Sequence, residues 1–466
     1  MKTPYRPIHR RDFLGTAGAV AAGMSCAGFA PISFPEPLNV AAQTHGAGVH
    51  APYRLTHPAK AKQLLIVFLT GGYSHVETFD YKPKLNADHG RTTTWHGHAQ
   101  ALLGSQFEFR PYGESGLMIS ELFSELGSVA DDLCVIRSMK TDNVEHFQAT
   151  LAMHTGSSSV PMPSIGSWLS YGLGSLNPNL PAYTVFCESM PYAGGQNWDN
   201  LFLPPVHQGV RILPGNDPVP NLKSPARSSV IADLQQAMLR DLNRLHYEQR
   251  DNDRQLLARD HATQVARGMM RVAPEVFDIR GETEKTFQSY ALESGDTTSF
   301  SWQCLTARRL LEQGVRVVEV IESGAQDNWD AHVDMKAHAP RSERVNRPLA
   351  ALICDLKQRG MLDDTLVAIC TEFGRTPITF NLKGREHHAD SFSCLLVGGG
   401  VKGGLAYGET DDYGIAVADR ECHVHDYHAT ILHLMGIDHE RLTYHYGGRD
   451  YRLTDVHGHV LNDIMA

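Results

Sequence analysis

Four residues of the sequence have side chains that could bind one divalent cation together, namely Asp330, His332, Glu372 and His387. Carboxylate oxygens and imidazole nitrogens are ligands that a hard or borderline divalent cation accepts, provided that rigid elements bring them to one point. These residues stand in separate polar loops beside apolar runs. We therefore predict a shared polar site with a bound metal. The alternative is a buried hydrogen-bonded network that holds the loops together.

The same loops hold a candidate nucleophile and candidate anion ligands. Ser74 lies in a Gly-Gly turn just past an apolar run, where backbone N–H groups can cradle an anion. Thr70 competes with it as a nucleophile, and either hydroxyl could instead cap a helix. Arg375 and Arg385 are predicted to clamp the charge of a phosphate or sulfate, because a guanidinium matches the geometry of these anions. Ordinary salt bridges are the alternative for both arginines.

A sheet is needed to hold these loops in place, and the apolar, β-branched runs of the sequence predict one. Because such runs alternate with helical segments, we predict an α/β fold with a mostly parallel central sheet sandwiched by helices. Ligands of open parallel sheets bind at the carboxyl ends of the strands, where the polar loops are expected. The predicted strands are residues 64–69, 133–137, 183–186, 315–321, 366–370 and 394–397.

Residues 225–300 break the alternation of strands and helices. Leu234, Met238, Leu242 and Leu245 recur there at helical spacing within a heavily charged segment. We interpret this part of the chain as a helical insertion in the sheet domain.

The N-terminus carries the features of a twin-arginine export signal. Arg10 and Arg11 are followed by Phe13 and Leu14 and then by a mild apolar run that is too short and too rich in Gly and Ala to span a bilayer. We predict a signal peptide and linker at residues 1–42 and one domain at 43–466. The twin-arginine translocase would then export the folded protein to the periplasm or the cell surface. An ordinary disordered terminus is the alternative.

Composition excludes several other classes of protein. The net charge of −10 leaves no basic footprint for nucleic acid, and no later segment looks transmembrane. The 8 cysteines are scattered without a C-x-x-C pair, several of them in apolar runs. This pattern favours buried thiols over a disulfide framework and suits a protein that folds in a reducing compartment.

Longer motifs resemble a known family. The segments FLTGGYSHVETFDYKP, TLVAICTEFGRTP, GREHH and HDYHATILHLMGIDHERLTYHYGGRDYRLTDV resemble the bacterial exported family called domain of unknown function 1501, over essentially the whole chain after the signal. That family is similar in core fold to the alkaline phosphatase and sulfatase superfamily. The resemblance implies a parallel-sheet fold that typically carries two metals, usually zinc, calcium, magnesium or manganese, and cleaves phosphate or sulfate esters.

The sequence departs from the superfamily pattern at two metal positions. Thr70-Gly71-Gly72 stands where members commonly have Asp, and Glu372-Phe373-Gly374 stands where they commonly have Asp-His-Gly. Asp330 and His332 match the pattern loosely. The Cys/Ser-x-Pro-x-Arg motif that sulfatases convert to formylglycine does not occur in the sequence, so a formylglycine sulfatase is not expected.

The downstream histidine of the superfamily pattern is matched by His387 or His388, and His75 is a further candidate ligand. The resemblance thus implies a single divalent metal of open identity. We expect a hydrolase-like protein that cleaves a phosphate or sulfate ester of a small molecule or a polysaccharide, with Ser74 or a water activated by the metal as the nucleophile. One alternative is a non-catalytic module that binds a glycan or a protein in a degenerate cleft. Another is a metallohydrolase of a different bond type.

Overall fold

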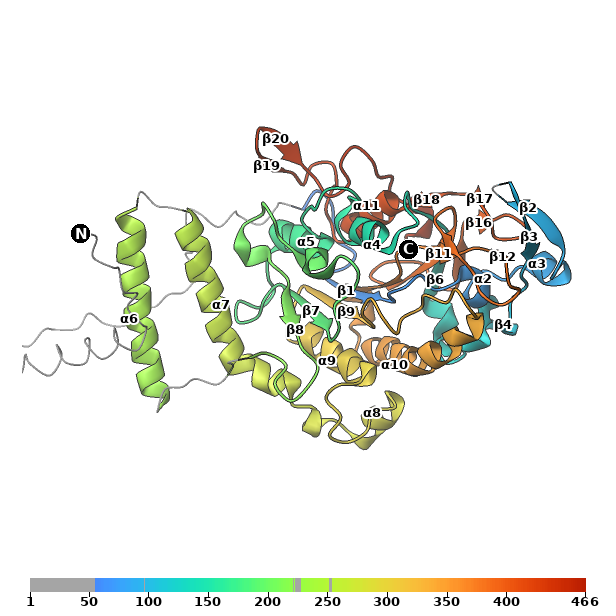
Figure 1. Ribbon diagram of the computed structural model, residues 1–466. Helices are drawn as coiled ribbons and strands as arrows, with labels where there is room; N and C mark the ends of the chain where they lie inside the picture. Colours follow the sequence, from blue (N-terminus) through green and yellow to red (C-terminus); the bar gives the residue numbers. More distant parts are fainter. Residues whose placement is uncertain (1–54, 96, 221, 223–227, 251–253) are drawn as a thin grey trace, which may run out of the picture. The chain divides into compact units, whose positions relative to one another are not determined.

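The computed structural model describes residues 55–95, 97–220, 222, 228–250 and 254–466. The predicted signal peptide lies outside these ranges, so export stays a prediction, as do the domain limits. At the centre is a nine-stranded sheet in the order β15-β6-β14-β10-β1-β9-β7-β8, in which β18 also pairs with β6 (Figure 1). Its strands are β1 (Gln63–Phe68), β6 (Leu133–Lys140), β7 (Tyr183–Cys187), β8 (Val210–Ile212), β9 (Val317–Ile321), β10 (Thr365–Cys370), β14 (Phe392–Gly398), β15 (Leu405–Tyr407) and β18 (Cys422–His423).

The sheet is mostly parallel, as predicted. β1 pairs in parallel with β9 and β10, and β7 pairs in parallel with β8 and β9. β14 is antiparallel to both of its neighbours, β10 and β6, and is the one reversed strand of this sheet. The start of β14 therefore lies at the same edge as the carboxyl ends of the other strands. All six predicted strands belong to this sheet, whereas β8, β15 and β18 have only two or three residues and give no periodic signal.

Helices cover both faces of the sheet (Figure 1). Leu65 and Val67 of β1 pack in one apolar cluster with α9 and α10, while Leu64, Ile66 and Phe68 pack in the other with α5 and α11. Alternate residues of a strand point to opposite faces, so a strand covered on both sides is apolar throughout. The helices are α2 (His75–Thr78), α3 (Pro83–Ala87), α4 (His146–Thr155), α5 (Ile165–Leu173), α6 (Ser229–Glu248), α7 (Arg254–Phe277), α8 (Glu284–Ser289), α9 (Phe300–Glu312), α10 (His338–Gln358) and α11 (Val424–Leu434).

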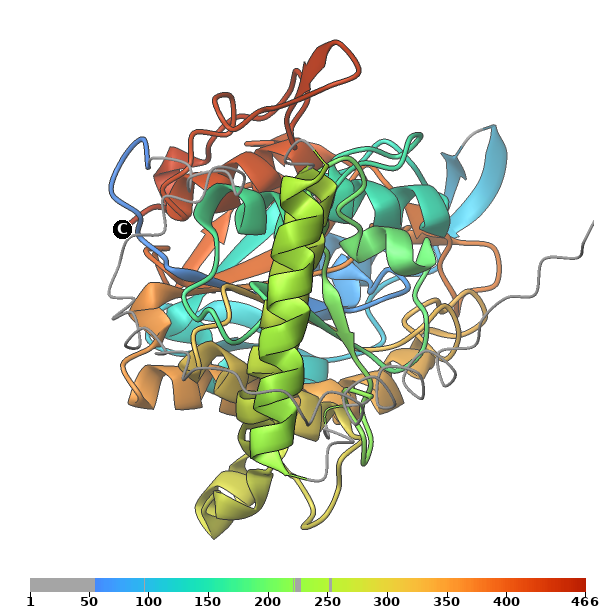
Figure 2. The same cartoon turned by 90° about the vertical axis from the view of Figure 1, so that its left-hand side faces the viewer.

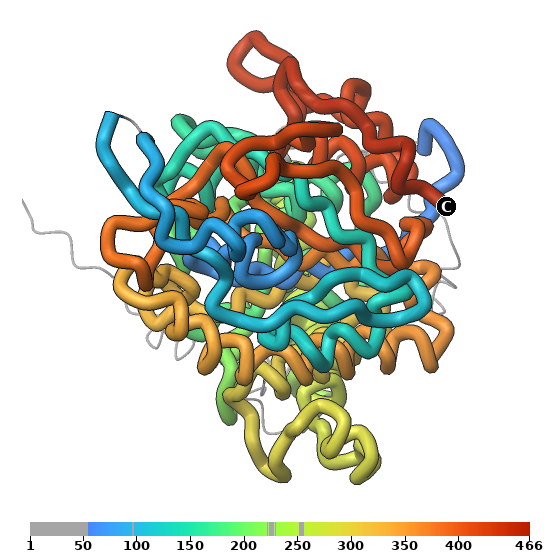
Figure 3. The backbone as a smooth tube through the Cα atoms, turned by 90° about the vertical axis from the view of Figure 1, so that its right-hand side faces the viewer, coloured from blue at the N-terminus to red at the C-terminus, as the bar shows by residue number. Residues whose placement is uncertain are grey.

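Short antiparallel ribbons lie outside the central sheet, and several of them face the viewer in Figure 3. The pairing of β11 with β13 matters most, because it sets Arg375 opposite His387. The short strands are β2 (Thr92–Trp95), β3 (His98–Leu102), β4 (Phe109–Tyr112), β5 (Leu117–Ser120), β11 (Gly374–Arg375), β12 (Ile378–Thr379), β13 (His387–His388), β16 (Glu409–Thr410), β17 (Val417–Asp419), β19 (Tyr444–Tyr446) and β20 (Arg449–Tyr451).

Two further expectations can be compared with the structure. The described residues of the predicted insertion include the helices α6, α7 and α8, while its limits stay a prediction. The seven cysteines among the described residues are free, and all but Cys354 are buried, which confirms the prediction of buried thiols. Within the described ranges, no helix combines the length and the apolar character that crossing a membrane requires.

Candidate metal centre

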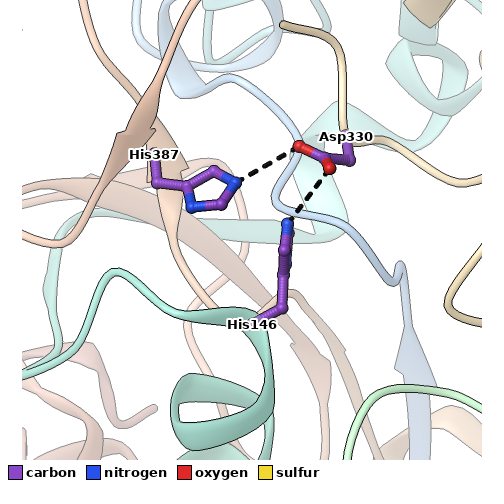
Figure 4. A group of neighbouring side chains, drawn as sticks. All are labelled: His146, Asp330 and His387. Atoms are coloured by element: carbon purple, nitrogen blue, oxygen red, sulfur yellow. Dashed lines mark hydrogen bonds and ion pairs between the residues drawn. The ribbon is translucent and has the colours of Figure 1, made fainter.

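Three side chains from distant parts of the sequence meet at the carboxyl edge of the sheet (Figure 4). His146 is the first residue of α4, which follows β6. Asp330 lies in the loop after β9, and His387 lies in β13, in the loop that leads into the reversed strand β14. Each of these side chains offers one ligand atom, and the three atoms lie within 4.8 Å of one another. Among the described residues this is the one group that meets that criterion.

The Asp330 carboxylate is at the centre of the cluster. Its Oδ2 lies 3.4 Å from His146 Nε2, and its Oδ1 lies 3.3 Å from His387 Nε2. His332 Nε2 comes within 2.8 Å of the same Oδ1 and within 3.0 Å of His387 Nε2. Three imidazoles thus direct Nε2 toward one carboxylate, which is a donor set suited to zinc and to other borderline cations.

The His146 ring is fixed from behind by a buried carboxylate. Its Nδ1 lies 2.7 Å from Oε1 of Glu372, which also accepts the Gly71 N–H, and Oε2 of Glu372 accepts the hydroxyl of Thr371. Tyr192 stacks on the ring at a centroid distance of 4.2 Å. An ionised carboxylate only accepts, so the proton of a neutral His146 is on Nδ1. Nε2 then carries a lone pair and is buried; among the described residues it makes no regular hydrogen bond, although Asp330 Oδ2 lies within ion-pair distance.

The other two imidazoles are oriented in the same way. His332 Nδ1 lies 2.8 Å from Oε2 of Glu386, and His387 Nδ1 lies 2.6 Å from the carbonyl oxygen of Val144. Both acceptors can take the ring proton from Nδ1, and a neutral ring then turns the lone pair of Nε2 toward the centre. The two Nε2 atoms lie 3.0 Å apart, and His332 Nε2 also lies 2.8 Å from Oδ1 of Asp330. This close approach requires a positive charge among these atoms, either a proton or a bound cation.

Arg375 supports the cluster from the sheet side. Its guanidinium is fully buried and donates to Asp330 Oδ1 and to the carbonyl oxygens of Gly71 and Gly72. The pairing of β11 with β13 sets it opposite His387. Arg375 therefore forms a salt bridge with Asp330, which was the alternative for this residue, and its donors are largely used within the protein.

The electrostatics of the cluster follow from these contacts. Burial would raise the pKa of Asp330, but the bonds from His146 and His387 and the Arg375 charge outweigh burial and hold this pKa well below its usual range. Burial would likewise lower the pKa of His146, yet the contacts with Asp330 and Glu372 raise it above the usual value. An ionised carboxylate beside electron-rich imidazoles is a suitable environment for a divalent cation.

Two predicted ligands lie away from this cluster. His75 Nε2 lies 2.9 Å from the carbonyl oxygen of Gly414, and His388 Nε2 lies 2.7 Å from that of Ile415. Burial lowers the pKa of both imidazoles. The contacts of these two histidines attach the loop at 414–415 to the sheet edge, and neither ring belongs to the group around Asp330.

Two other predicted catalytic residues are fully buried. Ser74 is fully buried at the start of α2, and its backbone N–H donates to His338 Nε2 at 3.1 Å. Arg385 is fully buried and donates to Oε1 of Glu77 from Nε at 2.9 Å and from Nη2 at 2.6 Å, and to the carbonyl oxygen of Thr376. Arg385 therefore forms an ordinary salt bridge, which was the alternative to the predicted anion clamp.

The structure therefore brings together Asp330, His332, His387 and Arg375, and it places Glu372 behind an imidazole rather than among the atoms that face the centre. His146 was missed by the sequence analysis. A usable signal was present, because His146 follows one of the predicted strands at the edge where ligands bind. Only the loops after other strands were considered.

Comparisons with known proteins complete the description of the site. The family model "Protein of unknown function (DUF1501)" matches residues 61–465. No protein of curated function matches the sequence.

Solved structures resemble the chain at low sequence identity. The lipoteichoic acid synthase LtaP from Listeria monocytogenes is 10% identical with a TM-score of 0.34, over 81% of this chain and 73% of that one. The C-terminal periplasmic domain of EcEptC from Escherichia coli, in complex with Zn, is 8% identical with a TM-score of 0.37, over 83% and 86%. An alkaline phosphatase from the Antarctic bacterium TAB5 is 10% identical with a TM-score of 0.29, over 74% and 92%.

Proposed function

The chain belongs to the DUF1501 family of proteins of unknown function, and from this premise we propose that it is a hydrolase-like enzyme that uses one divalent metal to cleave a phosphate or sulfate ester. His146, His387 and Asp330 are the proposed ligands, with His332 beside them. The sequence lacks the formylglycine motif, so the proposal does not include sulfatases that depend on formylglycine.

The observation that carries the proposal is the orientation of the imidazoles. His146, His332 and His387 each bind an oxygen through Nδ1 and direct Nε2 toward Asp330. Without a metal ion, His146 can pair with Asp330 Oδ2 at 3.4 Å only if both of its nitrogens carry a proton, because Nδ1 already faces Glu372. A divalent cation would take the place of the proton on Nε2 and bind this nitrogen together with the Asp330 carboxylate.

A divalent cation held by these ligands would polarise an ester oxygen and lower the pKa of a water. We propose water as the nucleophile, because the Ser74 side chain is fully buried. Arg375 is proposed to position Asp330 and keep it ionised through their direct contact. Arg385 has no role in the proposed reaction, because it forms a buried ion pair with Glu77.

The substrate must reach the cluster from solvent. The side chains of Asp330, His387 and His332 are partly exposed, at 26%, 20% and 36%, whereas Glu372 behind them is fully buried. A site open on one side suits an ester group presented by a small molecule or by a polysaccharide. The proposal includes both kinds of substrate.

Hydrolysis assays with metal-site variants test this function. The full chain is assayed with phosphate monoesters, phosphate diesters and sulfate esters in the presence of zinc, manganese, magnesium or calcium. We expect one ester class to be cleaved and the activity to be lost in Asp330→Asn and His387→Ala. His445→Ala is the matched control, because His445 is an exposed histidine that pairs with Asp450. The proposal fails if no ester is cleaved, or if both site variants keep the parent rate. Glycan binding that survives EDTA in an inactive protein would support the non-catalytic alternative.

We also propose that the protein acts in the periplasm or at the cell surface after export by the twin-arginine translocase. Replacing both Arg10 and Arg11 by Lys should retain the protein in the cytoplasm, as measured by cell fractionation. Unchanged export of this variant would contradict the proposed route.

A further inference from the structure

Helix α6 has an apolar face that the described part of the chain leaves largely exposed. Seven of its aliphatic side chains have exposed fractions of 40% or more, and Leu234 and Met238 reach 65% and 63%. The helix is the element nearest to the viewer in Figure 2. A contiguous apolar surface of this kind marks an interaction site rather than ordinary exposure. The seven residues, which we call the α6 apolar face, are Val230, Ile231, Leu234, Met238, Leu239, Leu242 and Leu245.

The opposite side of α6 contacts its neighbour α7 through polar groups. Asp233 pairs with Arg267 at 2.7 Å, and the Asn243 amide donates to Asp260 at 3.1 Å. A surface helix normally packs its apolar stripe against the protein and gives its polar residues to water. In α6 this orientation is reversed, because polar residues face α7 while the apolar face is exposed.

The spacing of the apolar residues is symmetric along the helix. Ile231, Leu234, Met238, Leu242 and Leu245 are separated by three, four, four and three residues. If a second copy of α6 is laid antiparallel with Met238 at the twofold axis, Ile231 meets the second copy's Leu245, and Leu234 meets the second copy's Leu242. A twofold dimer requires a surface that is complementary to itself. The stripe formed by these five residues has this property, whereas Val230 and Leu239, at the borders of the α6 apolar face, would meet His246 and Ala237.

The length of α6 suits such a contact. A 20-residue helix is about 30 Å long and presents several turns to such a contact.

We propose that α6 is the interface of a homodimer, in which two α6 helices pack antiparallel about Met238. A membrane surface fits the helix less well. Helices that lie in the membrane interface typically carry aromatic residues on the apolar face and an excess of Lys and Arg on the polar one. The exposed apolar side chains of α6 are all aliphatic, and Arg240 and Arg244 are offset by Asp233 and Asp241.

Sedimentation of the full chain gives the first test. We expect a species of twice the 51.5 kDa chain mass at micromolar concentration. Leu242→Asp should convert it to a monomer with an unchanged circular dichroism spectrum. Leu176→Asp is the matched control, because Leu176 is exposed to a similar degree, 46% against 52%, and lies outside α6. A monomeric parent chain, or a dimer that persists in Leu242→Asp, would overturn the proposal.

Disulfide trapping gives a second test that does not weaken the apolar face. Met238→Cys should form a covalent dimer under mild oxidation, because residue 238 meets itself at the axis. Leu245→Cys alone should not, since its two copies would lie about 21 Å apart along the helices, far beyond disulfide reach. Leu245→Cys mixed with Ile231→Cys should form the mixed dimer. Equal trapping of Met238→Cys and of Leu245→Cys alone would refute this register. A protein that stays monomeric and binds to lipid vesicles would refute the dimer.

Discussion

The Glu372→Gln substitution tests the assignment of Glu372 as the group that orients His146. Glutamine has nearly the same shape, and its amide oxygen can still accept the proton of His146 Nδ1. The substitution removes the negative charge that lies 2.7 Å from that nitrogen. We expect the affinity for zinc to fall, because the imidazole becomes a poorer electron donor while the ligand atoms stay in place.

The magnitude follows from the position of the carboxylate. Loss of a group that hydrogen-bonds a metal-binding histidine typically weakens metal affinity 10–100-fold, which corresponds to about 1.4–2.7 kcal/mol. The Glu372 side chain is fully buried, so solvent does not screen its charge. Glu386 has the same role behind His332 but is half exposed. Glu386→Gln is the matched control, and its effect should be several times smaller.

Competition titration of zinc against a chelating dye measures these affinities for the parent, Glu372→Gln, His146→Ala and the double variant. If Glu372 acts only through His146, adding Glu372→Gln to His146→Ala should change the affinity little. Unchanged affinity in Glu372→Gln would refute the reasoning. Fully additive losses would instead make Glu372 a ligand in its own right, as the sequence predicted.

Three further predictions concern the surroundings of the cluster. The raised pKa of His146 means that its ion pairs contribute stability fully below its unfolded pKa of about 6.5, and that this contribution is lost as pH rises through the folded pKa. In EDTA, the melting temperature of the parent chain should therefore fall relative to that of His146→Ala as pH rises through this window. Arg385→Met leaves Glu77 buried without its partner and should lower the free energy of unfolding in urea by about 3–5 kcal/mol. Gly71→Ala should also lower it, by more than about 1 kcal/mol, because φ is +107° and the added Cβ would lie 2.6 Å from Oδ1 of Asn328.

The sequence predicted the frame of the fold well, because buried parallel strands leave a local signal. The runs at 64–69 and 366–370 are apolar throughout, and they became the neighbouring strands β1 and β10. Loops that follow such strands meet at one edge, so Asp330 and His387 could be placed together before their geometry was known. The order of the strands and the reversal of β14 depend on long-range pairing and were not predicted.

The assignment of individual side chains was less successful, because it depends on local backbone geometry. His387 and His388 are neighbours in sequence, but they belong to the short strand β13, where successive side chains point to opposite faces. His387 therefore faces Asp330, while His388 contacts the carbonyl group of Ile415. For Glu372, the sequence placed a carboxylate at the end of a strand but could not show that an imidazole lies in front of it.

Equilibrium dialysis against zinc, followed by elemental analysis, tests the metal centre most directly. The full chain should retain one zinc ion per molecule, and both His146→Ala and His387→Ala should lose it, whereas the exposed control His445→Ala should keep it. A parent chain without stoichiometric metal, or site variants that bind zinc as the parent does, would contradict the account.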